Sequence, residues 1–233
     1  MKVSLVQFSH GIPRRRFVPF DDPILMMIYD IGLICRGNNL NNVLAEKFPV
    51  EYQHATNPTI PEIKDYIHKK ANKFFDQWVV GKEHTSLMEH VSFTFFVDGI
   101  SRACSHQLVR HRMASYTQES QRYTVLDGNT KPVLPNVGNP EQHKKFVKMF
   151  KNMKKIYAEL IEEGYPKEDA RGVLPNCTPT KLFVTMNGRS LLHFFRLRLW
   201  DSAAQWEIRE VARRMHKNVS ALTSIFDEDR WDK

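Results

Sequence analysis

Apolar residues recur at helical spacing in two long segments of the chain. The pattern Thr59-Ile60-Pro61-Glu62 is typical of a capping box and predicts the start of the first helix. Its apolar stripe consists of Ile63, Ile67, Ala71, Phe74, Phe75 and Trp78. A second helix is predicted from Asn139-Pro140, with proline at its first position, to Gly164. Its stripe consists of Phe146, Met149, Phe150, Met153, Tyr157, Leu160 and Ile161.

Shorter patterns predict three more helices. The first two cover residues 100–110 and 189–199. The third is a long last helix that Ser202-Ala203-Ala204-Gln205 would cap. Its inward positions are Ile208, Val211, Met215, Val219 and Leu222. Strands are predicted at residues 2–8 and 90–97, the latter ending in a turn at Asp98-Gly99, and a buried strand at 180–186. Loops are predicted at residues 11–23 and over most of 112–140.

Helices therefore outnumber strands, and the two do not alternate regularly. This order favours an α+β fold over a doubly wound sheet. We expect a small, mostly antiparallel sheet packed with long helices, in a single domain over residues 1–233. No apolar run approaches the roughly 18 residues that cross a bilayer, and the N-terminus lacks a signal-peptide core, so we expect a cytoplasmic protein without membrane contact.

The composition adds charge to this picture. The formal net charge is +8, which suits either nucleic acid or several small anions such as nucleotides. Much of it comes from lysines at helix-face positions, which usually mark a solvated surface: Lys144, Lys145, Lys148, Lys151, Lys154 and Lys155. Three widely spaced cysteines (Cys35, Cys104 and Cys177) argue against a disulfide framework. His84, Glu89 and His90 lack the spacing of a zinc site, so we expect no metal.

The segment from Arg110 to Tyr123 carries the most informative chemistry. It holds three arginines and a histidine among hydroxyl and amide side chains, with few apolar residues between them. A guanidinium fork suits phosphate, and amide side chains can pair with the edge of a base or an isoalloxazine ring. The segment therefore predicts a polar loop around something anionic and flat, against the alternative of a surface loop with surplus charge.

Arg110-His111-Arg112 followed by Ser120 resembles the signature of the flavin-dependent thymidylate synthases. Four other blocks, in the same order as in that family, extend the resemblance over residues 81–209. They are His84–Val91, Ala170–Pro175, Asn187–Leu191, and Arg198 followed by Ala204–Ile208. Thr117-Gln118 replaces an Asn-Glu pair frequent in the family, and His193 stands where some members have Asn. The step from Arg198 to Gln205 is also one residue longer than in some members.

The resemblance implies that the protein methylates dUMP to dTMP. Methylenetetrahydrofolate would supply the carbon, reduced FAD the hydride and NADPH the electrons, in a homotetramer with shared active sites. The residues implied to contact FAD are His84, Ser86, Arg110, His111, Arg112, Gln118, Asn187, Gly188, Arg189 and His193. Those implied to contact dUMP are Gln107, Arg110, Gln118, Glu119, Ser120, Gln121, Arg122, Arg171 and Arg198.

Arg198 is the expected catalytic residue, because a cation at the uracil edge would favour loss of the N3 proton and enrich C5. The alternative for Arg198 is a structural ion pair with Glu207 or Asp201. No cysteine nucleophile is expected: Cys177 is interpreted as a small structural residue, and Ser120 as a substrate contact. The rival functions are a basic nucleic-acid-binding protein and a flavoprotein of other specificity.

Overall fold

The computed structural model describes residues 1–8, 22–38 and 60–231. They form two compact units. The first unit comprises Met1–Val6, Thr94–Thr185 and Phe194–Arg214, and the second comprises Gln7–Phe93, Met186–His193 and Met215–Lys233. The predicted Thr59 cap and nearly all of the predicted 11–23 loop lie outside the described residues.

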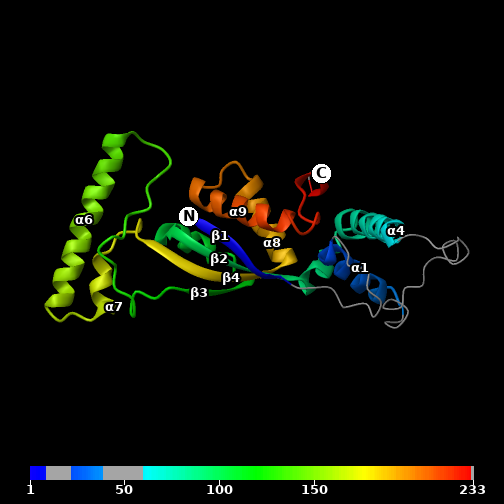
Figure 1. Cartoon of the computed structure of the whole chain (residues 1–233), viewed down its shortest axis with the longest axis horizontal. Helices are drawn as coiled ribbons and strands as arrows, with labels where there is room; N and C mark the ends of the chain where they lie inside the picture. The colour runs from blue at the N-terminus through cyan, green and yellow to red at the C-terminus, as the bar shows by residue number, and fades with distance from the viewer. Residues whose placement is uncertain (9–21, 39–59, 232–233) are drawn as a thin grey trace, which may run out of the picture. The chain divides into compact units, whose positions relative to one another are not determined.

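The described strands form one four-stranded sheet in the order β1-β2-β4-β3 (Figure 1). The strands are β1 (Lys2–Phe8), β2 (Ser92–Ser101), β3 (Ala114–Gln118) and β4 (Pro179–Asn187). Thr94 on β2 is hydrogen bonded to Thr185 on β4, and the Phe96 ring contacts the Phe183 ring further along. Because the residue number rises on one strand as it falls on the other, β2 and β4 are antiparallel. The predicted α+β class with a small antiparallel sheet is confirmed.

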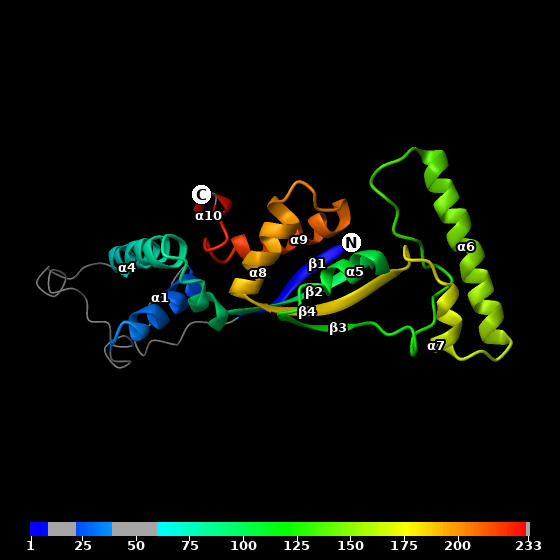
Figure 2. The same ribbon diagram turned by 180° about the vertical axis from the view of Figure 1, so that it is seen from behind.

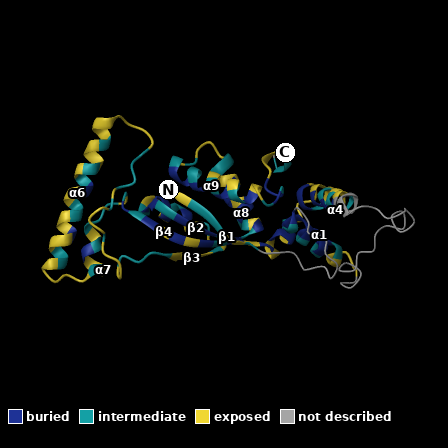
Figure 3. Cartoon of the chain, viewed as in Figure 1, coloured by how far each residue is buried: buried dark blue, intermediate teal, exposed yellow. Residues whose placement is uncertain are grey.

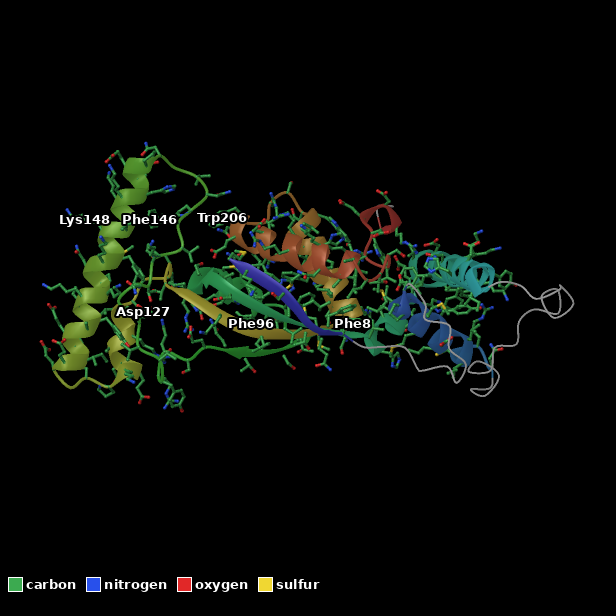
Figure 4. All side chains as sticks on the ribbon, viewed as in Figure 1. Phe8, Phe96, Asp127, Phe146, Lys148 and Trp206 are labelled. Atoms are coloured by element: carbon green, nitrogen blue, oxygen red, sulfur yellow. The ribbon has the colours of Figure 1, made fainter. Side chains whose placement is uncertain are left out.

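The two central strands alternate between a buried and an open face. Phe95, Val97, Leu182 and Val184 are at most 2% exposed. The residues between them, including Phe96 (labelled in Figure 4), stay partly or fully exposed. The predicted strand at 180–186 is therefore present, but it is buried on alternate positions rather than throughout.

One sequence prediction about this sheet is wrong, and another misses a short strand. Asp98-Gly99 is not a turn, because β2 runs through it to Ser101; Gly99 tolerates its φ of 74° since it lacks a Cβ. The segment predicted as a loop from Arg112 contains β3. As the last strand in the sheet order, β3 can expose alternate side chains, so its polar sequence is compatible with an edge strand.

The remaining elements of the first unit are helices and helical turns. Helix α5 (Arg102–Leu108) begins at Ser101, whose hydroxyl caps it by accepting from the amide of Cys104. The long α6 (Pro140–Glu162) starts at the predicted Asn139-Pro140, where Asn139 and Gln142 form a capping box, and ends just before Gly164 at φ 92°. It lies beside α7 (Lys167–Ala170) and the 3-10 turn η3 (Arg171–Val173) in both views (Figures 1 and 2).

Helix α6 is mostly exposed (Figure 3), with only Phe150 and Tyr157 buried. The predicted helix at 189–199 is divided into α8 (Gly188–Phe195) and a π-helical turn, η4 (Arg196–Trp200). The last long helix is α9 (Trp206–Ser220). Its cap is the side chain of Gln205, which accepts from the amides of Glu207 and Ile208, and not Ser202.

The second unit is mainly helical. It holds α1 (Pro23–Cys35), α4 (Ile60–Phe74), the π-helical η1 (Phe75–Val80), the 3-10 helix η2 (Thr85–His90), most of α8, the end of α9, and α10 (Glu228–Trp231). Tyr29 of α1 packs edge-on against Phe74 of α4 at 5.4 Å between ring centroids. No helix in the described part of the chain is long and apolar enough to span a membrane.

Candidate functional site

The Arg110-His111-Arg112 motif follows directly after α5 in the first unit. Tyr116 of β3 holds this turn, because its hydroxyl lies 2.9 Å from the carbonyl oxygens of both Leu108 and His111. Burial raises the pKa of Tyr116 to about 12, so the phenol keeps the proton that it donates. Sequence reasoning missed Tyr116, although it is the aromatic residue at the centre of the otherwise polar segment.

Arg198 lies against this motif. Its Nε–H donates to Nε2 of His111 over 3.1 Å, so His111 accepts at Nε2 and carries its ring proton on Nδ1. The ring of His111 rests edge-on against buried Phe194, at 4.9 Å between centroids. Since Nε is engaged, the two terminal NH₂ groups of Arg198 remain as donors for another partner.

The alternative ion pairs of Arg198 are not the arrangement found. Both carboxyl oxygens of Glu207 accept hydrogen bonds from Ser101, and Asp201 accepts from the amide of Ala203. Each acid thus has another partner, and the hydrogen bond that positions the Arg198 side chain goes to a histidine.

Arg110 and Arg112 flank His111 and are both exposed. Among the described ion pairs, neither arginine takes part in one. Two adjacent exposed guanidiniums without an acidic partner form a positively charged surface suited to phosphate.

Arg122 and Arg171 meet at one residue of α7. The Nε of Arg122 pairs with the Glu168 carboxylate at 2.8 Å, and the Nε of Arg171 donates to the Glu168 carbonyl at 3.0 Å. The ion pair is half-exposed on both sides, so it is weak, of about 0–1 kcal/mol, and an incoming anion can replace it. The structure therefore brings the arginines together as two groups, one around His111 and one around Glu168.

A cavity of about 220 Å³ in the same unit is lined by Arg102, Glu119, Gln121, Tyr157 and Lys181, among others. Arg102 donates from Nη2 to the Glu119 carbonyl at 2.9 Å, while its buried Nε and the buried hydroxyl of Tyr157 have no hydrogen-bond partner in the described structure. Desolvation, and then the charge of Arg171, lowers the pKa of Arg102. Two unsatisfied buried donors at one cavity favour a ligand with acceptor oxygens. The sequence did not indicate either Arg102 or Tyr157 as a site residue.

Three other predicted residues are already partly engaged. The Gln118 amide nitrogen donates to Ser105 and Thr180, which leaves its oxygen as the available group. The Ser120 hydroxyl accepts from the amide of Arg122, and the Glu119 carboxylate lies 3.3 Å from Lys181. Gln107 is half-buried on α5.

The other predicted cofactor residues belong to the second unit. Asn187 caps α8 by accepting from the amide of Ser190, and Arg189 pairs with Glu89 at 2.5 Å. Gly188 is closely packed, because a Cβ there would lie 2.8 Å from the Met88 carbonyl oxygen. His84, Ser86 and His193 are exposed. The predicted FAD set thus has members in both units, whereas the predicted dUMP set lies entirely in the first.

The thiols of Cys104 and Cys177 are poorly suited to nucleophilic attack. Cys104 is buried, and burial together with the charge of Glu207 raises its pKa far above the ordinary value; burial also raises the pKa of Cys177. Cys35 is exposed. Within the described residues, no group of three or more His, Cys, Asp or Glu side chains is placed to hold a metal ion.

Comparison with known proteins connects this site to a family. The model of the family described as "Thymidylate synthase complementing protein" matches residues 36–223. A flavin-dependent thymidylate synthase of Pyrococcus furiosus is 46% identical over 162 residues, which cover 66% of this chain and 65% of that protein. The matched part thus spans just under two thirds of that relative's length.

Two solved structures share the fold. A UMP/dUMP methylase, PolB, from Streptomyces cacaoi, bound with 5-Br dUMP, superposes with a TM-score of 0.69 at 23% identity, over 97% of this chain and 93% of its own. Thymidylate synthase X from Helicobacter pylori, with FAD and dUMP, gives 0.69 at 18% identity over 100% of both chains. Because the family model covers most of the sequence, the family predicted from the Arg-His-Arg motif is confirmed, and the chain belongs to the thymidylate synthase complementing protein family.

Proposed function

We propose that the protein methylates dUMP to dTMP, with methylenetetrahydrofolate as one-carbon donor and FAD, reduced by NADPH, as hydride carrier. The observation that carries this proposal is the 3.1 Å hydrogen bond from Arg198 to His111. This bond joins the predicted catalytic arginine to the signature motif, although the two residues are 87 positions apart in the sequence. Family membership and the names of the relatives support the same activity.

The nucleotide site is proposed in the first unit. Arg122 and Arg171, gathered at Glu168, supply positive charge for the phosphate, and Ser120 supplies a hydroxyl. Gln107, Arg110, Gln118, Glu119 and Gln121 complete the proposed set with Arg198. The cavity lined by Glu119 and Gln121 adds Arg102, whose unsatisfied Nε suits an acceptor-rich ligand.

The donor set is also suited to FAD. The exposed guanidiniums of Arg110 and Arg112 suit a diphosphate, and the free amide oxygen of Gln118 suits a ring edge. His111, His84, Ser86, Asn187, Gly188, Arg189 and His193 are the other proposed contacts. When bound, the reduced flavin would supply the hydride that completes the methyl group.

Arg198 is proposed to act on the uracil ring. With its Nε held by His111, its two NH₂ groups can both face one edge of the ring. A cation there stabilises the anion left by loss of the N3 proton, typically by about 1–3 pKa units. The resulting electron density at C5 makes that carbon the nucleophile, so no protein nucleophile is required.

We further propose that the chain is one catalytic domain and that it works as a homotetramer with shared active sites. We propose that it acts in the cytoplasm and binds neither nucleic acid nor a metal. Two phosphorylated ligands fit the basic residues of the proposed site, since each ligand needs compensating charge.

The proposed activity is tested with the purified protein. We expect flavin absorption bands, and NADPH oxidation that requires dUMP and yields dTMP. A colourless protein with strongly salt-dependent oligonucleotide binding would instead support a nucleic-acid-binding function. A yellow protein that ignores dUMP would indicate a flavoprotein of other specificity.

Substitution Arg198→Lys separates binding from chemistry. A lysine has a single nitrogen in place of the planar three-nitrogen fork, so it cannot hold one nitrogen on His111 while two others face the edge of the uracil ring. We expect turnover to fall roughly 100-fold while the dissociation constant of dUMP rises less than about 10-fold. Arg213→Lys, at an ion pair with Glu210 on the surface of α9, is the control and should keep wild-type turnover. Wild-type turnover in Arg198→Lys would reject the proposed action of Arg198 on the uracil ring.

The cysteines provide an independent test of the mechanism. We expect Cys177→Ser to retain turnover within a few-fold, since the proposed mechanism needs no cysteine thiolate to attack the nucleotide. Iodoacetamide at pH 8 should modify exposed Cys35 and leave buried Cys104 unmodified until the protein unfolds. Loss of activity in Cys177→Ser, or a dUMP adduct on Cys177 in mass spectra, would contradict the mechanism.

A further inference from the structure

Two hydrogen-bonded links join the same two segments of the first unit. The first link lies between Ser101 at the start of α5 and Glu207 in the first turn of α9. The second lies between His111, after the end of α5, and Arg198 in the turn η4 that precedes α9. Each segment is thus held at two points, and in both segments these points lie about ten residues apart along the chain.

The Ser101–Glu207 link is short and fully buried. The Glu207 carboxyl accepts from the amide of Ser101 and from its hydroxyl, both at 2.6 Å, and the two residues are 3–4% exposed. A buried acid is costly unless its oxygens are satisfied, so the geometry of this pair is tightly constrained.

Both ends of this link are themselves fixed to the helices that they start. Ser101 also caps α5, and the Glu207 amide donates to Gln205, which caps α9. A displacement of Glu207 would therefore move the start of α9 relative to the start of α5. It would also change the distance between Arg198, which precedes α9, and His111, which follows α5.

We propose that Glu207 is a positioning residue that holds Arg198 on the Arg-His-Arg motif through Ser101. Glu207 touches no reacting atom and acts through the placement of the Arg198 guanidinium. This inference rests on the proposed function, because its kinetic consequence concerns Arg198 at the uracil ring.

The test compares two substitutions of Glu207 in the full-length holoenzyme. Glu207→Asp keeps the charge but is one methylene shorter, so it cannot reach both donors of Ser101. We expect its kcat to fall roughly 10- to 100-fold, with less than a threefold change in the dissociation constant of dUMP. Glu207→Gln keeps the length and one acceptor, and should restore kcat to within a few-fold of wild type. Glu210→Asp, one turn along α9, is the matched control and should leave kcat unchanged.

A double substitution separates positioning from plain stability. If Glu207 acts through Arg198, adding Glu207→Asp to Arg198→Lys should lower kcat less than threefold further. Losses that multiply, or wild-type kcat in Glu207→Asp, would overturn the proposal. So would a parallel loss of dUMP affinity, flavin content and thermal stability. If Glu207→Asp does not fold, Ser101→Ala, which removes the hydroxyl half of the link, takes its place with the same expectations.

A nitrogen-15 NMR measurement makes the outcome independent of activity. In wild type, His111 should carry its proton on Nδ1, and Glu207→Asp should shift the population towards the other tautomer. An unchanged His111 signal in that variant would overturn the inference even in an active enzyme. Absence of dUMP-dependent turnover in wild type would instead contradict the proposed function, and the His111 signal would still decide whether Glu207 positions Arg198.

Discussion

A hydrogen bond between a guanidinium and a neutral imidazole is the interaction on which the proposed chemistry depends. It fixes the orientation of Arg198 by occupying Nε, and it requires His111 to accept rather than donate. The motif turn that presents His111 is held by the Tyr116 hydroxyl, and the start of α5 is held by the buried Glu207 carboxyl. Side chains from the end of β2, from β3 and from α9 thus contribute to the placement of one cation.

The helices were predictable because their signals are local. The Asn139-Pro140 pair and the glycine at residue 164 mark both ends of α6, and apolar spacing identified α9. The errors occurred where tertiary context decides the structure. Asp98-Gly99 is a typical turn pair, yet β2 continues through it to Ser101. The polar sequence of β3 suited a loop equally well until its place at the sheet edge was known.

The candidate site was predictable to the extent that residue type alone implies chemistry. Arginines and the signature spacing could be identified from the sequence, and they led to the correct family. Tyr116, Arg102 and Glu207 could not be identified in this way, because their importance lies in partners distant in sequence or in burial. Glu207 illustrates the difficulty: its charge suggested an ion pair with Arg198, whereas the fold places it on the amide and hydroxyl of Ser101, 106 residues away.

The most direct measurement of the central claim is the ionisation of a bound nucleotide analogue. The N3 proton of 5-fluoro-dUMP can be followed by fluorine NMR as the pH is raised, with the nucleotide free and bound to the holoenzyme. We expect the N3 pKa of the bound nucleotide to lie about 1–3 units below that of the free nucleotide, and most of this difference to vanish in Arg198→Lys. A bound pKa equal to or above the free value would contradict the role of the guanidinium.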